Sequence, residues 1–238
     1  MNDEIGQDEL VRRLKILASA FQGLSQADDE TTYNEYTPLA LHLSDEFFLN
    51  HQSKDVQLLV ACCVADILRI FAPEAPYKEP PQIKTIFMFI TKQLSGLKDP
   101  KDPAFKRYFY LLENLAYVKS FNMCFDLEDC TEIFVSLFAL IFKIVNDEHS
   151  GKVKNFMMEV LSPLITESDN VGNELLDTIL QNIVDPLKTQ RKNSYSLAKE
   201  LVIKTSDTLE PYIQQFFNQV ILQLLNCKVT FLLTLCRF

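Results

Sequence analysis

The sequence has no tryptophan, only 5 glycines and only 3 histidines in 238 residues. The glycines lie far apart, from Gly6 to Gly172, so they form neither a P-loop nor a dinucleotide-binding fingerprint. No histidine has a partner at metal-ligand spacing, and Cys124 and Cys130 lack a second Cys or His pair nearby. We therefore expect no bound metal and no cofactor.

No local group of residues suggests catalysis. A catalytic triad of Ser, His and Asp is assembled in space by folding, so a sequence without a local triad motif can still form one. Nothing in the local sequence supports such a triad here. The acidic residues Asp126, Glu128 and Asp129 stand at the start of a predicted helix, where negative side chains stabilise the positive helix end. We interpret them as capping residues and predict that the protein is not an enzyme.

Positive charge is scarce at the start of the chain. The formal net charge is -9, and residues 1–50 hold 10 acidic but only 3 basic side chains. An acidic segment repels the phosphates of nucleic acid. Direct DNA binding is therefore disfavoured.

Signals for secretion, disulfides and membrane insertion are also missing. The 6 cysteines are scattered, and Cys62 and Cys63 are neighbours, which argues against a disulfide scaffold. The N-terminus has no basic segment followed by an apolar one. The longest apolar stretch, from Ile133 to Val145, is shorter than the about 20 residues that span a bilayer. We expect a reducing compartment, cytosol or nucleus, and no membrane association.

What the sequence does contain is typical of helices. Hydrophobic residues make up 47% of the chain, enough for a sizeable core, and Leu, Lys, Glu, Gln and Phe are plentiful. One helix is predicted to follow Ser53 as a cap and to end at Phe71, because Pro73 forces the preceding residue out of helical geometry. Further breaks are predicted at 80–81, 99–103, 122–125, 146–151, 168–172 and 186–193.

Four of the predicted helices carry the same apolar stripe, at spacing i, i+3, i+4, i+7 and i+8. The first stripe consists of Val56, Leu59, Val60, Cys63 and Val64. The others begin at Phe105, Val153 and Ser194, so successive starts are 49, 48 and 41 residues apart.

Other apolar helices are predicted between the striped ones, at about 83–97, 127–145 and 171–184. The repeating unit is therefore a helical hairpin close in length to a HEAT or armadillo unit. Hairpins of this kind bury their faces by stacking. We predict an all-α fold, a HEAT-repeat-like right-handed α-solenoid. The alternative is a compact helical bundle with evenly spaced helices.

Two features are candidate binding sites. The first is the proline turn, defined as Ala72, Pro73, Glu74, Ala75, Pro76 and Tyr77. Two prolines three residues apart favour an extended backbone that would display Tyr77. The alternative, favoured by the residues alone, is an ordinary inter-helix turn with Tyr77 packed inward.

The second candidate is a basic ridge near the starts of the later striped helices, with Lys54 at the equivalent place in the first. Equivalent positions align in a solenoid, so these side chains would form a ridge for an acidic peptide or a polyanion. An ordinary solvated surface is the alternative. The ridge consists of Lys106, Arg107, Lys152, Lys154, Arg191 and Lys192.

Several runs, together covering about residues 9–220, resemble the N-terminal region of the precocious-dissociation-of-sisters family of cohesin regulators. These runs are Leu39-Ala40-Leu41-His42-Leu43, the segment 54–67, Ala72-Pro73-Glu74-Ala75-Pro76-Tyr77, the segment 107–116 and Phe125-Asp126-Leu127-Glu128-Asp129-Cys130.

This resemblance implies a non-enzymatic HEAT-repeat scaffold in the nucleus that regulates sister chromatid cohesion. Members of the family bind the kleisin subunit of cohesin, the release factor Wapl and its antagonist sororin, and so reach chromatin indirectly. The family's Ala-Pro-Asp/Glu-Ala-Pro element binds partners. The resemblance therefore implies the same role for residues 72–76, with Tyr77 as their neighbour.

The end of the chain departs from the family pattern. We expect a HEAT-repeat segment at 1–224 and a divergent tail at 225–238, as in a truncated or alternatively spliced product. A solenoid end without a polar capping repeat exposes apolar surface. Family members continue for many more repeats, and kleisin binding is in question where the kleisin contacts need those repeats. The competing function is a HEAT-type transport adaptor that binds basic localisation peptides.

Overall fold

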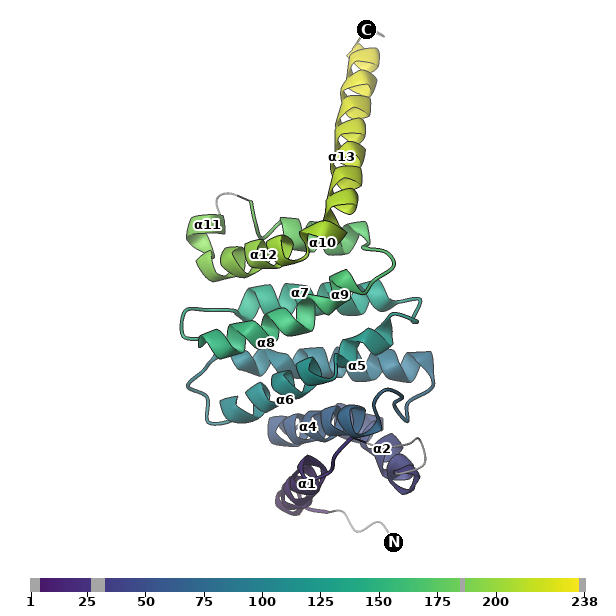
Figure 1. Cartoon of the computed structure of the whole chain (residues 1–238), viewed down its shortest axis with the longest axis vertical. Coiled ribbons are helices and arrows are strands. Elements are labelled where there is room, and N and C mark those ends of the chain that lie inside the picture. The colour runs from purple at the N-terminus through teal and green to yellow at the C-terminus, as the bar shows by residue number, and fades with distance from the viewer. Residues whose placement is uncertain (1–4, 27–32, 185–186, 236–238) are drawn as a thin grey trace.

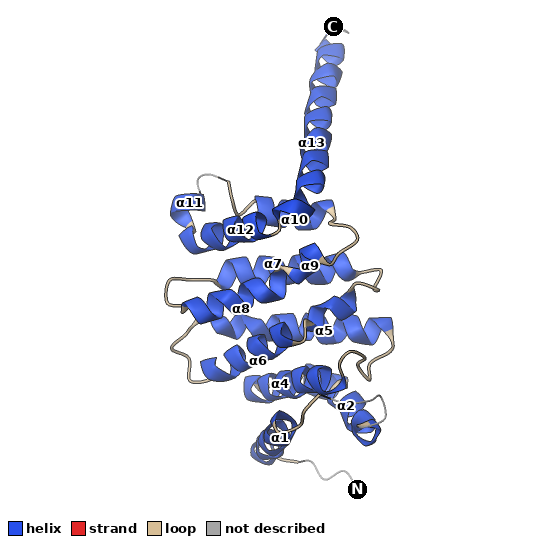
Figure 2. Ribbon diagram, in the orientation of Figure 1, coloured by secondary structure: helices blue, strands red, loops and turns tan. Residues whose placement is uncertain are grey.

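The computed structural model describes residues 5–26, 33–184 and 187–235, and within them all regular structure is helical (Figure 2). The elements are α1 (Gln7–Gln22), η1 (Asn34–Tyr36), α2 (Thr37–Leu43), α3 (Glu46–Leu49), α4 (Lys54–Phe71), α5 (Pro80–Leu94), η2 (Ser95–Lys98), α6 (Phe105–Tyr117), η3 (Ser120–Cys124), α7 (Cys130–Ile144), α8 (Gly151–Leu161), α9 (Pro163–Thr166), α10 (Asn173–Leu180), α11 (Leu187–Gln190), α12 (Lys192–Lys204) and α13 (Ser206–Leu235).

The helices stack in two rows along the long axis of the molecule (Figure 1). One row contains α4, α6, α8 and α12, and the other contains α5, α7 and α10, with each helix contacting the next in its row. The first helix, α1, packs on α4, while α13 projects from the last layer. The predicted α-solenoid is confirmed, and the alternative of a compact bundle is wrong.

The repeat length predicted from the stripes reappears in the polar contacts between neighbouring layers. Tyr110 bonds to Asp66, 44 residues earlier, and Asn146 bonds to the carbonyl of Lys98, 48 residues earlier. Asn173 bonds to Gln219, 46 residues later. Stacking thus places each residue beside its counterpart in the next repeat.

The apolar stripes of the helices pack against the core and against the neighbouring repeats. The stripe of α4 is buried throughout, from Val56 to Val64. The stripe of α6 is half-buried at Phe105 and Phe109 because these rings lie at the junction with the next repeat. There Phe109 contacts Phe156, with ring centroids 5.7 Å apart.

Several local predictions need correction. Pro80 and Pro81 do not merely break the chain, because they occupy the first turn of α5, where proline's missing N–H has no helical partner to lose. Neither Ser53 nor Asp129 forms a side-chain cap bond, although each stands at the N-cap position. Asp129 instead accepts a hydrogen bond from Lys84 at 2.9 Å, in the preceding repeat.

The predicted division at residue 224 falls inside α13, whose backbone continues as a helix to Leu235. That division stays a prediction. Among the described residues, no helix combines the length and the apolar character that a membrane crossing requires.

Gly96 is the one glycine where a close approach demands the absence of a side chain. A Cβ atom there would lie 2.1 Å from the Tyr108 ring. We predict that Gly96→Ala lowers the free energy of unfolding by about 1–3 kcal/mol through overpacking. Urea denaturation measures this loss. The loss should largely vanish when Tyr108→Ala is the background, and an equal loss in both backgrounds would contradict the proposed clash.

Candidate partner-binding surfaces

The proline turn begins where α4 ends. Ala72 follows Phe71 with an extended backbone (ψ 141°), as expected for a residue that precedes proline. The Ala72–Pro73 peptide bond is cis. Helical structure resumes only at Pro80, so the segment between α4 and α5 projects at one edge of the solenoid, on the right in Figure 1.

The proline turn has a buried side and an exposed side. Tyr77 is only 3% exposed, and its hydroxyl donates to the carbonyl of Ala40 at 3.3 Å. Burial raises the pKa of that hydroxyl. Ala75 is also buried, whereas Pro73 and Glu74 are exposed. Tyr77 therefore packs inward and supports the turn, so a partner would meet Pro73 and Glu74 instead.

Polar contacts hold the exposed side in place. Gln26, beyond the end of α1, donates its side-chain amide to the carbonyl of Ala72 at 3.0 Å. Glu74 accepts a hydrogen bond from Lys78 at 2.8 Å, which lowers the pKa of the glutamate carboxyl. The proline turn is thus fixed to α1 as well as to α4.

Behind the turn, α4 carries a fully buried carboxylate, Asp66. Its Oδ1 atom accepts hydrogen bonds from the Tyr110 hydroxyl at 2.6 Å, the Asn114 amide at 2.9 Å and the Arg69 guanidinium at 3.1 Å. Burial raises the pKa of Asp66, while these donors oppose the shift. A buried charge is tolerated only with such partners, so this network ties α6 to α4.

Arg69 extends the same network to α1. Its guanidinium donates to the carbonyls of Leu24 at 2.8 Å and Phe21 at 2.9 Å. Phe21 lies in the last turn of α1 and Leu24 lies just beyond it, at the end where the helix dipole favours a cation. One buried carboxylate thereby orients the arginine that binds the end of α1, three residues before the start of the turn.

The basic ridge lies at the edge opposite the proline turn. Cys62 lies against Arg107 and Asp66 against Tyr110, so α4 and α6 run in the same direction. The N-terminal ends of α6, α8 and α12 therefore share one edge, on the left in Figure 1. The turn follows the C-terminal end of α4, whose 18 residues span about 27 Å. The two candidate surfaces are thus separate.

The six ridge residues do not act alike. Lys152 pairs with Glu113 at 2.9 Å and lies over the Phe109 and Phe156 rings, 5.1 and 5.6 Å from their centroids. Lys154 donates to Asn193 at 3.2 Å. These two lysines join neighbouring repeats. Within the described part of the chain, the remaining four have no ion-pair partner: Lys106, Arg107, Arg191 and Lys192.

No group of three or more His, Cys, Asp or Glu side chains in the described residues is arranged to hold a metal ion. Cys62, Cys63 and Cys124 are buried free thiols whose pKa values burial raises. A neutral, buried thiol is a poor nucleophile.

The network around Asp66 gives a direct test. We predict that Tyr110→Phe, which removes one charge-assisted hydrogen bond, lowers the free energy of unfolding by about 1.5–3 kcal/mol. Urea denaturation measures it. Tyr117→Phe on the same helix is the matched control, because Tyr117 is 78% exposed and should tolerate the change. Equal stability of the two variants would contradict the network's role.

Comparison with known proteins supports the family that the sequence motifs indicate. The family model described as "Sister chromatid cohesion protein PDS5 protein" matches residues 8–234. The PDS5 homolog B-B of Xenopus laevis is 52% identical over 93% of this chain and 15% of its own length. The PDS5 homolog A of Homo sapiens is 52% identical over 93% of this chain and 16% of its own length.

The fold matches as well. A chain in the solved structure of the Pds5-Scc1 complex is similar with a TM-score of 0.79 and 25% identity, over 96% of this chain and 35% of that chain. The chain spans about a sixth of the length of the curated relatives named above. The chain belongs to the PDS5 family of sister chromatid cohesion proteins.

Proposed function

We propose that this chain is a non-enzymatic scaffold of sister chromatid cohesion that works in the nucleus by binding the kleisin subunit of cohesin. The observation that carries the proposal is the 52% identity with sister chromatid cohesion proteins over 93% of the chain. The solved complex of a PDS5 relative with Scc1 supports a kleisin as partner. The family membership favours this function over a transport adaptor.

The fold is suited to such a role. Stacked hairpins give a long surface with two separate edges, and repeat proteins of this type present extended binding surfaces.

Affinity capture tests the scaffold role. With the full chain as bait in nuclear extract, we expect immunoblots to recover cohesin subunits, including the kleisin. An unrelated acidic helical-repeat protein is the control bait. A folded bait that retains no cohesin subunit above this control would overturn the proposal.

Within this role, the proline turn is the proposed docking element for a short peptide of Wapl, with sororin as a competing ligand for the same turn. Three features support it: Pro73 and Glu74 are exposed, Ala75 and Tyr77 anchor the turn from inside, and Gln26 fixes its backbone. A rigid, preorganised loop loses little entropy when it binds.

Because Tyr77 is buried, a test of the turn should change its exposed residues. We predict that Pro73→Ser with Glu74→Lys weakens the binding of overlapping Wapl peptides by about ten-fold or more, as a contact residue at the centre of a small interface would. Fluorescence anisotropy measures the affinity.

Glu159→Lys is the matched control, since Glu159 is exposed on α8, two helices along the row from α4, and has no ion-pair partner among the described residues. It should bind the peptides with unchanged affinity. If the turn variant also binds them unchanged, the turn is not the docking element, whereas the capture of cohesin remains a separate result.

A further inference from the structure

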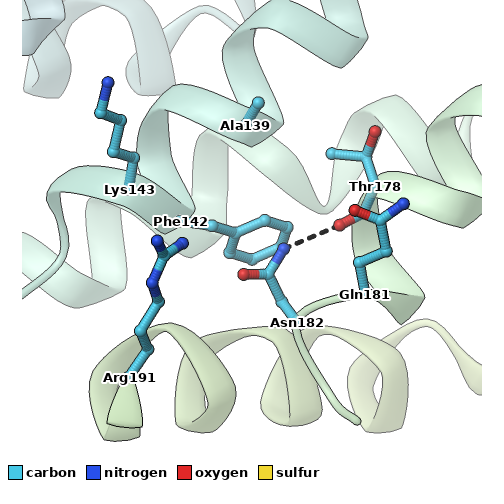
Figure 3. A pocket seen from close by; sticks show the side chains of 7 residues that line it. All are labelled: Ala139, Phe142, Lys143, Thr178, Gln181, Asn182 and Arg191. Atoms are coloured by element: carbon cyan, nitrogen blue, oxygen red, sulfur yellow. Dashed lines mark hydrogen bonds between the residues drawn. The ribbon is translucent and has the colours of Figure 1, made fainter. Parts of the chain in front are cut away.

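A small hollow of about 280 Å³ lies where the end of α7, the end of α10 and the start of α12 meet (Figure 3). One wall is the C-terminal end of α7, with Ala139, Phe142 and Lys143. The second wall is the end of α10, and the third is Arg191, directly before α12. The hollow therefore lies on the same edge as the basic ridge and includes a cation, Lys143, that belongs to the other row of helices.

The neutral polar groups around the hollow are already engaged within the protein. Asn182 donates to the carbonyl of Thr178 at 2.8 Å and accepts from the Ser194 hydroxyl at 2.5 Å. The Thr178 hydroxyl donates to the carbonyl of Glu174 at 2.8 Å. These bonds connect α10 to α12 and fix the shape of the rim. They leave few neutral donors for a ligand.

The two cations are the groups that remain available. Lys143 and Arg191 are exposed, and neither has an ion-pair partner in the part of the chain that the structure describes. Figure 3 shows the Arg191 guanidinium extending toward Phe142, whereas the Lys143 ammonium points away from the other side chains. A lysine stem rotates easily, so the ammonium can turn toward an anion at the rim.

The base of the hollow is apolar. Phe142 is 3% exposed and Ala139 offers a methyl group at the surface. The volume lies below the range of about 300–1,000 Å³ that holds a drug-sized ligand. The hollow thus fits one or two side chains of a partner rather than a nucleotide cofactor.

We propose that this hollow, with Lys143 and Arg191 at its rim, is a docking site for an acidic peptide of a partner protein, with an apolar side chain beside Ala139 and a carboxylate within reach of the two cations. Charge complementarity argues for an acidic occupant, and the apolar base argues for a peptide over inorganic phosphate. This site is independent of the proline turn, because it lies on the opposite edge.

Fluorescence anisotropy with the full chain tests the proposal. The probe is a labelled peptide that alternates glutamate with leucine and phenylalanine. We expect Lys143→Glu with Arg191→Glu to weaken its binding by about ten-fold or more, because both salt bridges are replaced by repulsion. Ala139→Glu is a second variant at an exposed position and should weaken binding in the same direction.

Lys15→Glu with Lys92→Glu is the matched control, since it changes the net charge equally at two exposed lysines on α1 and α5. Its affinity should stay within about two-fold of the unmodified chain, as expected for distant surface charges. Equal weakening in the control, or no binding of the peptide by the unmodified chain, would overturn the site. Displacement of the peptide by tripolyphosphate or duplex DNA at lower concentration than by unlabelled peptide would also overturn it, in favour of a polyanion site.

Discussion

The buried carboxylate of Asp66 is the interaction on which the packing of α1, α4 and α6 depends. It lies in the middle of α4, a helix buried along most of its length, and one of its oxygens binds side chains of α4 and α6. Through Arg69 it also fixes the C-terminal end of α1. Because an uncompensated charge at this depth is costly, the three helices are constrained to one arrangement. The proline turn, which follows α4 directly, takes its position from that arrangement.

The same stacking determines where the two candidate surfaces lie. Helices of one row run in the same direction, so their starts align on one edge and their ends on the other. Cations near the starts either connect neighbouring repeats, as Lys152 does with Glu113, or remain open to solvent, as Arg191 does. Packing therefore determines which of these cations remain without a partner among the described residues.

The sequence predicted the solenoid well because an apolar stripe must be buried whatever covers it, and the stripes from Val56 onward recur at a regular interval. It did not predict which ridge lysines are engaged, since the pairing of Lys152 depends on the offset between two stacked helices. Lys143 was missed because it reaches the ridge edge from a helix that runs in the opposite direction. Asp66 had a visible signal, a single acid within an apolar run, and the same run carried the family resemblance. The residues of the proline turn, taken without the family resemblance, correctly favoured the inward position of Tyr77.

Each hairpin is stabilised mainly by its neighbours, and α4 is the most enclosed of the helices. Hydrogen–deuterium exchange on the free chain tests it most directly, because amide protection reports the free energy of local opening. We expect α4 amides to exchange slowest, and protection to decline toward α1 in one direction and toward α12 in the other. Uniform protection across all these helices would contradict it, since that result describes a single cooperative bundle.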